Sequence, residues 1–143
     1  MTVDLKARSV RTLAWLGDVE FEREVRLRLV GRGDYATDRL DAVKALVVRA
    51  ERQAALLAII EPALDEDEAS VVRRARNTSP RASSRSQRST KDYRAATALE
   101  ALVAHWQHGA AGGPARFAAL LAPEIERAID EALAQAGTRI RRG

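Results

Sequence analysis

Two acidic residues, Asp18 and Glu100, each stand alone among small and apolar residues. Asp18 directly follows Gly17 in an otherwise apolar stretch over 13–18, and Glu100 lies inside the alanine- and leucine-rich run 95–103. A glycine inside a helix costs about 1 kcal/mol relative to alanine, and a structural reason for one is the close approach of another helix. If the two segments pack through Gly17 and the alanines, both carboxylates meet in one cleft. Two oxygen ligands facing water suit Mg²⁺, which keeps several of its waters.

The same acids also have a structural interpretation, because each could pair with a nearby arginine, and structural ion pairs are common. Glu22, one turn after Asp18 on the same face, either supports the metal ligands or pairs with Arg26. The spacing of Glu22 and Arg26 slightly favours the ion pair.

Other chemistry-bearing residues give weaker patterns. His105 and His108 could share a helix face, but two histidines without a third ligand are poor evidence for zinc. The acidic cluster 65–68 fits a helix start, with Asp65 as N-cap and Glu68 as its capping-box partner, better than a calcium loop. The sequence has no glycine-rich phosphate loop and no convincing Ser-His-Asp set.

Positive charge is concentrated in one segment. The chain carries 24 lysines and arginines against 20 acids, a net charge of +4. Residues 73–94 contain eight cations and a single acid, net +7, so the remainder carries −3. This segment suits a polyanion, with nucleic acid as the first candidate; the alternative is a solvated basic loop.

These residues must be positioned by helices, because helix formers dominate and no segment alternates apolar with polar residues. We expect an all-α protein with helices over about 9–30, 65–76 and 92–108. Between the first two of these, a helix capped by Thr37 or Asp38 carries Leu40, Val43 and Val47, and another runs from about Ala50 to Ile60 before Pro62. The junction near Arg49 is open, with one long helix as the alternative. A last helical region begins with Pro114 at its first position, bends near Pro123 and stops at Gly137. Residues 77–90 form a flexible basic loop and 138–143 a basic tail.

Length and composition limit the remaining choices. A chain of 143 residues suits one domain, 1–143, with a core over about 9–136. The absence of cysteine excludes disulfides and thiol chemistry, and there is no signal peptide or apolar run long enough for a membrane span. We therefore expect a cytoplasmic protein that does not contact a membrane. An aromatic content of 4% argues against base-stacking sheets.

Several motifs occur in the order and spacing of one known family. Residues 13–22, LAWLGDVEFE, resemble L-A-Y-I-G-D-A-V-Y-E, and residues 96–102, ATALEAL, resemble A-T-G-F-E-A-L. Residues 73–77, RRARN, resemble the R-R-G-R-N that opens a variable basic loop, and Tyr93-Arg94 resembles the Y-R that closes it. Residues 48–54, with Gln53 and Ala54, more loosely resemble V-S-A-K-A-Q-A. Together the motifs resemble the ribonuclease III family in its short form, Mini-ribonuclease III, over residues 10–107.

The resemblance implies the helical, homodimeric ribonuclease III endonuclease fold and cleavage of double-stranded RNA with Mg²⁺. Asp18 and Glu100 would be the catalytic metal ligands, hydrolysis would leave 5′-phosphate and 3′-hydroxyl ends, and the substrate would be a stem of the large-subunit (23S) ribosomal RNA precursor. Two further acids of longer members are replaced here by Ala14 and Thr97, as in the short form, which also lacks the separate RNA-binding domain. The RNA-binding residues would be Arg73, Arg74, Arg76, Asn77, Arg81, Arg85, Arg88, Lys91, Tyr93 and Arg94.

Two departures from the family pattern keep other functions in view. Glu20 replaces an apolar residue and Phe21 replaces a tyrosine. One alternative is a non-catalytic helical RNA-binding or ribosome-assembly protein, which would bind RNA without Mg²⁺-dependent turnover. Another is a small basic DNA-binding protein, which would not prefer RNA duplexes. The sequence leaves open whether a ribosomal protein assists and whether Mn²⁺ replaces Mg²⁺.

Overall fold

The protein is built from helices throughout the part of the chain that the structure describes. The computed structural model describes residues 3–78 and 87–142, and within them there is no strand. This confirms the all-α prediction. The elements are α1 (Val10–Arg32), α2 (Thr37–Val48), α3 (Ala50–Ile60), the 3₁₀ turn η1 (Glu61–Ala63), α4 (Glu66–Arg76), α5 (Gln87–Ala104), the π-helical turn η2 (His105–Gly109), α6 (Gly113–Leu120) and α7 (Ala122–Arg142).

Local signals explain where several helices begin and end. The Ser9 side chain accepts a hydrogen bond from the Thr12 amide at 3.3 Å and so caps α1. Asp65 and Glu68 form the predicted capping box, each side chain accepting from the other residue's amide at 2.9 and 2.8 Å. An extended backbone at Arg49 (ψ 153°) separates α2 from α3, so these are two helices.

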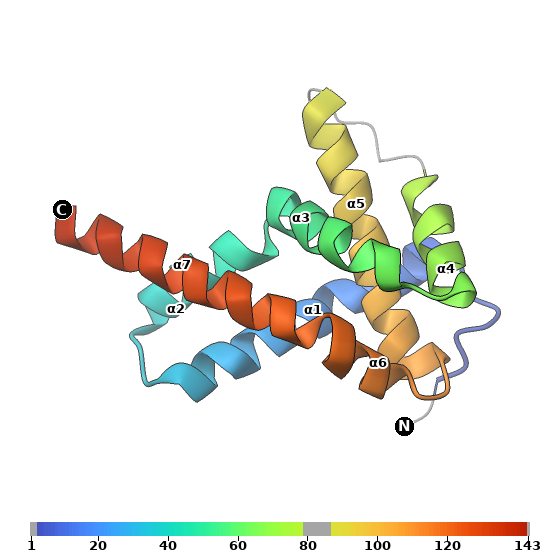
Figure 1. Cartoon of the computed structure of the whole chain (residues 1–143), viewed down its shortest axis with the longest axis horizontal. Helices are drawn as coiled ribbons and strands as arrows, with labels where there is room; N and C mark the ends of the chain where they lie inside the picture. The colour runs from blue at the N-terminus through green and yellow to red at the C-terminus, as the bar shows by residue number, and fades with distance from the viewer. Residues whose placement is uncertain (1–2, 79–86, 143) are drawn as a thin grey trace.

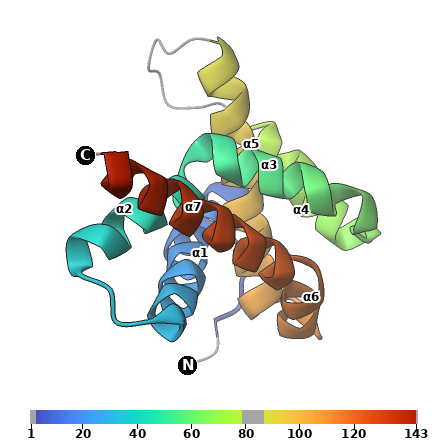
Figure 2. The ribbon, with the colours of Figure 1, turned by 60° about the vertical axis from the view of Figure 1, so that its left-hand side comes forward.

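Helix α5 lies at the centre of the fold. It packs most extensively against α1 and also against α3 and α4 (Figure 1). The long helix α7 crosses the molecule next to α2, and the view in Figure 2 shows α2 on the opposite side of the molecule from α4. Helix α5 is therefore the element against which the site residues of α1 and α3 are placed.

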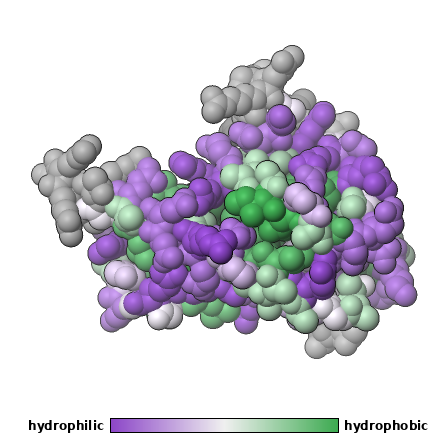
Figure 3. Space-filling view, in the orientation of Figure 1, coloured by the Kyte–Doolittle hydropathy of each residue, from purple (hydrophilic) through white to green (hydrophobic). Residues whose placement is uncertain are grey.

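The core is made where α1, α5 and α7 meet. Phe21 and Val25 of α1, Leu102 of α5 and Ile129 of α7 are at most 1% exposed. The i, i+4 spacing of the α1 residues is the periodicity that predicted this helix. On the surface face seen in Figure 3, hydrophilic side chains surround an apolar patch near the middle. None of the described helices combines the length and apolar character needed to cross a bilayer.

The buried carboxylate of Glu68 connects three elements through hydrogen bonds and an ion pair. Glu68 of α4 is 2% exposed, accepts a hydrogen bond from Trp106 Nε1 at 2.7 Å, and forms a bidentate pair with Arg116 of α6 at 2.6 and 2.9 Å. The Arg116 guanidinium is the main reason that the pKa of Glu68 is lowered to about 2. The sequence predicted the capping role of Glu68 but not its contacts with Trp106 and Arg116.

Several predicted boundaries were wrong. Helix α2 begins at Thr37 after Ala36, so neither Thr37 nor Asp38 is its N-cap. Helix α5 begins at Gln87 and not at Asp92, since residues 87–91 contain no glycine or proline to stop it, and its first turns project beyond the other helices (Figure 1). Helix α7 continues through Gly137 to Arg142, because one glycine costs only about 1 kcal/mol. Pro114 is the second residue of α6 and not the first. The first residue is Gly113, where a Cβ would lie 1.9 Å from the Trp106 carbonyl oxygen, so only glycine fits there.

Candidate active site

The site begins with a backbone contact between α1 and α5. A Cβ added to Gly17 would lie 1.7 Å from the carbonyl oxygen of Glu100, so only glycine fits. The predicted close approach at Gly17 is confirmed. Because Asp18 is the next residue, the contact brings its side chain beside that of Glu100.

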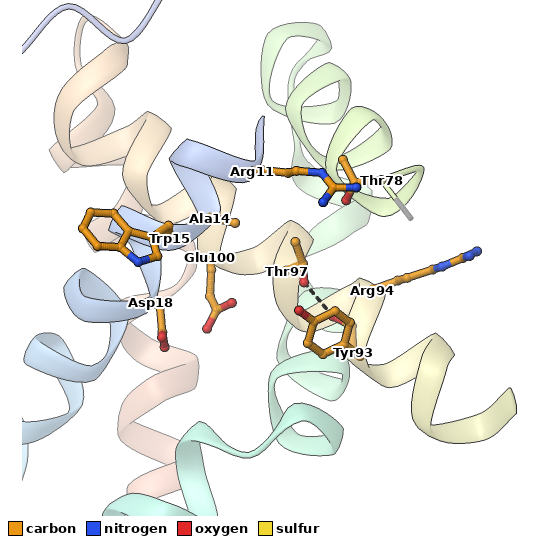
Figure 4. A pocket seen from close by; sticks show the side chains of 9 residues that line it. All are labelled: Arg11, Ala14, Trp15, Asp18, Thr78, Tyr93, Arg94, Thr97 and Glu100. Atoms are coloured by element: carbon orange, nitrogen blue, oxygen red, sulfur yellow. Dashed lines mark hydrogen bonds between the residues drawn. The ribbon is translucent and has the colours of Figure 1, made fainter. Parts of the chain in front are cut away.

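An open pocket of about 440 Å³ lies over this contact. Its lining residues are Arg11, Ala14, Trp15, Asp18, Thr78, Tyr93, Arg94, Thr97 and Glu100. Asp18 is exposed and Glu100 is half-buried. Figure 4 shows the two carboxylates side by side and pointing in the same direction. The structure thus brings the two singled-out acids together.

The environment of Glu100 disfavours its negative charge. Burial and, next, the neighbouring Asp18 carboxylate raise the pKa of Glu100 to about 8. A hydrogen bond from Gln53 Nε2 at 3.4 Å acts in the opposite direction. A positive charge placed next to Glu100 would therefore stabilise its ionised form.

A divalent cation fits this pair of residues. Its charge would offset both the burial of Glu100 and its repulsion by Asp18. The described residues contain no group of three or more acids, histidines or cysteines that could hold a metal, so this pair would supply two protein ligands. Two carboxylates and open space for water match the preference of Mg²⁺, which is commonly bound through one or two carboxylates.

The other lining residues come from α1, α5 and the end of α4. Arg11 and Trp15 precede Asp18 by seven and three residues, which places them on the same side of α1. Ala14 and Thr97 both line the pocket, and the Thr97 hydroxyl donates to the Tyr93 carbonyl at 2.9 Å. These two positions thus add no charge, so the pocket contains only two carboxylates.

Glu22, Glu20 and the histidines lie outside this pocket. Glu22 pairs with Arg26 at 2.9 Å and with Lys44 at 3.6 Å, as the ion-pair interpretation expects. His108 Nε2 lies 2.7 Å from Glu20 Oε1, which gives the unusual acid at position 20 a partner. The Glu20 side chain, which departs from the family pattern, therefore connects α1 to η2 and adds no charge to the pocket.

The predicted RNA-binding residues are spread over two helices. Arg73 and Arg74 are exposed on the last turn of α4, whereas Arg76 pairs with Glu61. Asn77 ends α4 and is exposed. On α5, Lys91, Tyr93 and Arg94 are also exposed, and Tyr93 and Arg94 line the pocket. Arg81 and Arg85 lie outside the described residues, and of Arg88 only the backbone is described.

Four residues at the site were not predicted from the sequence: Arg11, Trp15 and Thr78, which line the pocket, and Gln53, which contacts Glu100. The helical spacing from Asp18 could have identified Arg11 and Trp15. Gln53 was noted only as part of a loosely matching motif, and no local pattern indicates that its side chain reaches Glu100, 47 residues away in the chain.

Comparison with known proteins agrees with this arrangement. The family model described as "Ribonuclease III domain" matches residues 11–106. A Mini-ribonuclease 3 from Desulfitobacterium hafniense is 46% identical over 98 residues, 67% of this chain and 60% of the relative. A Mini-ribonuclease 3 from Symbiobacterium thermophilum is 42% identical over 94 residues, 66% of this chain and 72% of the relative.

A solved structure has the same fold over most of its length. The crystal structure of a protein from Fusobacterium nucleatum superimposes with a TM-score of 0.64 at 29% identity, covering 74% of this chain and 86% of that chain. The match to the Desulfitobacterium protein, by contrast, spans less than two thirds of that relative's length.

Proposed function

The chain belongs to the ribonuclease III family, and we propose that it is a metal-dependent endoribonuclease that cleaves double-stranded RNA. The observation that carries the proposal is the Asp18–Glu100 pair, which faces one open pocket across the contact at Gly17. The family match includes both acids.

In the proposed reaction, Asp18 and Glu100 hold the metal ion, with Mg²⁺ as the ion that the donor set favours. When bound, the ion supplies a Lewis acid that activates water and stabilises negative charge at the scissile phosphate. Tyr93 and Arg94, on the α5 side of the same pocket, contact the RNA backbone next to the cleaved bond. The products carry 5′-phosphate and 3′-hydroxyl ends.

The substrate is bound through its backbone. Double-stranded RNA presents phosphates and 2′-hydroxyls, and proteins recognise it mainly by shape and by contacts to these groups. Arg73, Arg74 and Lys91 are exposed on the helices that flank the pocket. They supply the cations, together with the arginines of the intervening segment. The similarity to the short form of the family supports a stem of the 23S ribosomal RNA precursor as the natural substrate.

The protein acts as a homodimer. Trp15 and Val19 are 77% and 66% exposed on α1, on either side of Asp18 in the sequence. Large apolar side chains on a surface are typical of protein interfaces, in which tryptophan often contributes strongly to binding. A two-fold dimer would present two sites, one for each strand of the duplex.

Incubation with a plain RNA duplex tests the enzyme against its alternatives. We expect cuts that require Mg²⁺ and leave 5′-phosphate ends, and no cuts by Asp18→Asn, which still binds the duplex. Single-stranded RNA and a DNA duplex of the same sequence serve as comparison substrates. A duplex that is bound but stays whole, also as a precursor ribosomal stem, would support a non-catalytic RNA-binding protein. Equal binding of the RNA and DNA duplexes would instead support a DNA-binding protein.

A further inference from the structure

Gln53 is an unusual buried residue next to the site. Within the described residues, Gln53 and Glu68 are the buried polar or charged side chains, and Gln53 is 3% exposed. It lies in the first turn of α3, which packs against α5. A buried amide must find hydrogen-bond partners or reduce stability.

The end of α2 fixes the orientation of this amide. Gln53 Nε2 lies 2.8 Å from the carbonyl oxygen of Val48, the last residue of α2. Carbonyls at the end of a helix lack partners within the helix, so this one is free to accept. Because a carbonyl cannot donate a hydrogen bond, the amide nitrogen and not its oxygen must face Val48.

The second N–H of the same nitrogen is directed at the site. It donates to Glu100 Oε2 at 3.4 Å. One oxygen of Glu100 is thus held by Gln53, while the carboxylate as a whole still faces the pocket. The arrangement connects the end of α2 through one amide to a residue of α5.

This arrangement leaves one polar atom of Gln53 without a partner. Its Oε1 is buried and has no hydrogen bond within the described part of the chain. Leaving a buried acceptor unpaired lowers stability, and an apolar side chain of the same length would avoid this cost. A local cost of this kind is expected where a residue serves function.

We propose that Gln53 is a positioning residue for the metal site, which holds the Glu100 carboxylate in the orientation that binds the cation. The inference rests on the proposed function, since it assumes that Glu100 is a metal ligand. Residues that hydrogen-bond to metal ligands commonly change metal affinity or activity by about 10–100-fold.

Metal binding without RNA tests the inference directly. Mn²⁺ serves as the probe, with its Kd measured by paramagnetic resonance on the full chain. Gln53→Met keeps the length of the side chain but has no donor, and we expect its Kd to rise about tenfold or more. Gln107→Met is the matched control, because Gln107 Nε2 donates to Glu24 Oε1 at 3.3 Å and neither residue lines the pocket. Its Kd should equal that of the wild type.

Cleavage kinetics separate positioning from a general loss of structure. In Gln53→Met, the Mg²⁺ concentration for half-maximal cleavage should rise by the same factor as the Mn²⁺ Kd. The KM for duplex RNA at saturating Mg²⁺ should stay unchanged. An unchanged Kd in a folded Gln53→Met would overturn the role of Gln53 and leave the nuclease intact. A wild type that neither binds Mn²⁺ nor cleaves RNA would overturn both proposals.

A measurement on the wild type covers the case in which Gln53→Met does not fold. The side-chain amide protons of Gln53 can be followed by NMR during a Mg²⁺ titration. We expect their signals to shift with added Mg²⁺, those of Gln107 to stay in place, and both to stay in place in Asp18→Asn. If the Gln53 signals do not move while backbone signals around Asp18 do, the inference is wrong.

Discussion

Two glutamates with restricted exposure, Glu68 and Glu100, have pKa values shifted in opposite directions. Glu68 is nearly inaccessible but contacts Arg116, so its pKa falls to about 2. Glu100 is partly buried and faces Asp18; burial first, and then the Asp18 carboxylate, raise its pKa to about 8. Burial raises the pKa of both carboxyls; the arginine outweighs burial at Glu68, and the second carboxylate adds to it at Glu100. An arginine thus compensates the charge of Glu68, whereas the surroundings of Glu100 disfavour its charge.

The low pKa of Glu68 makes stability depend on pH in the acid range. Its contribution is fully present above the ordinary value of 4.5 and is lost as the pH falls through about 2. A shift of this size corresponds to about 3 kcal/mol. Between pH 5 and pH 2, the free energy of unfolding should therefore fall by about 3 kcal/mol less in Glu68→Gln than in the wild type. Urea denaturation at a series of pH values measures this difference. The same pH dependence of the free energy of unfolding in both proteins would contradict the prediction.

The sequence alone identifies site residues that differ in type from their neighbours in the chain. Asp18 and Glu100 could be singled out because each interrupts an apolar run, and Gly17 because glycine disfavours a helix. Gln53 could not, because its importance depends on a hydrogen bond to a residue of another helix. Local periodicity contains no information on such distant contacts.

At the scale of elements, helix positions were predictable and several ends were not. The α1 face and the α4 capping box follow from local spacing, and both are confirmed. At the start of α6, Gly113 lies against the Trp106 carbonyl, a distant contact that excludes a side chain and that local spacing does not reveal. The turn η2 has π-helical geometry, and nothing in the spacing of His105 and His108 predicted it.

The last turn of α4 gives a prediction about RNA affinity. Arg73 and Arg74 are exposed there, and their contacts to phosphate would release counterions on binding. The double substitution to alanine should weaken binding of an RNA duplex. It should also reduce the magnitude of the slope of log affinity against log salt concentration by about 1–2. Filter binding at several salt concentrations measures both quantities.

Arg127→Ala is a suitable control for the charge change. Arg127 is a highly exposed arginine of α7 that pairs with Glu124. Its removal should leave the salt slope unchanged. An unchanged slope in the Arg73/Arg74 double variant would exclude a role of this turn in binding phosphate.

At the scale of the whole molecule, the exposed apolar side chains of α1 bear on the oligomeric state. Trp15 lines the pocket and yet is 77% exposed, so a partner that covers this face would also border the site. Composition could not predict this, because it does not distinguish an exposed tryptophan from a buried one; the other tryptophan, Trp106, is fully buried.

Sedimentation velocity tests whether this face joins two copies. We expect the wild type to be a dimer and Trp15→Asp to be a monomer, because a charge cannot be buried in an apolar contact without a large cost. Ile59→Asp changes another exposed apolar residue, on α3, and should remain a dimer. A monomeric wild type, or a dimeric Trp15→Asp, would contradict the proposed interface.

The most direct test of the central claim is the cleavage rate of duplex RNA at saturating Mg²⁺ in four proteins. These are the wild type, Asp18→Asn, Glu100→Gln and the double variant. If the two carboxylates hold one metal ion, each single change should lower the rate by at least about 10²–10³-fold, and the double variant should be little worse. Glu51→Gln, an exposed acid of α3, should match the wild type. A near-wild-type rate in either single variant would contradict the assignment of the active site.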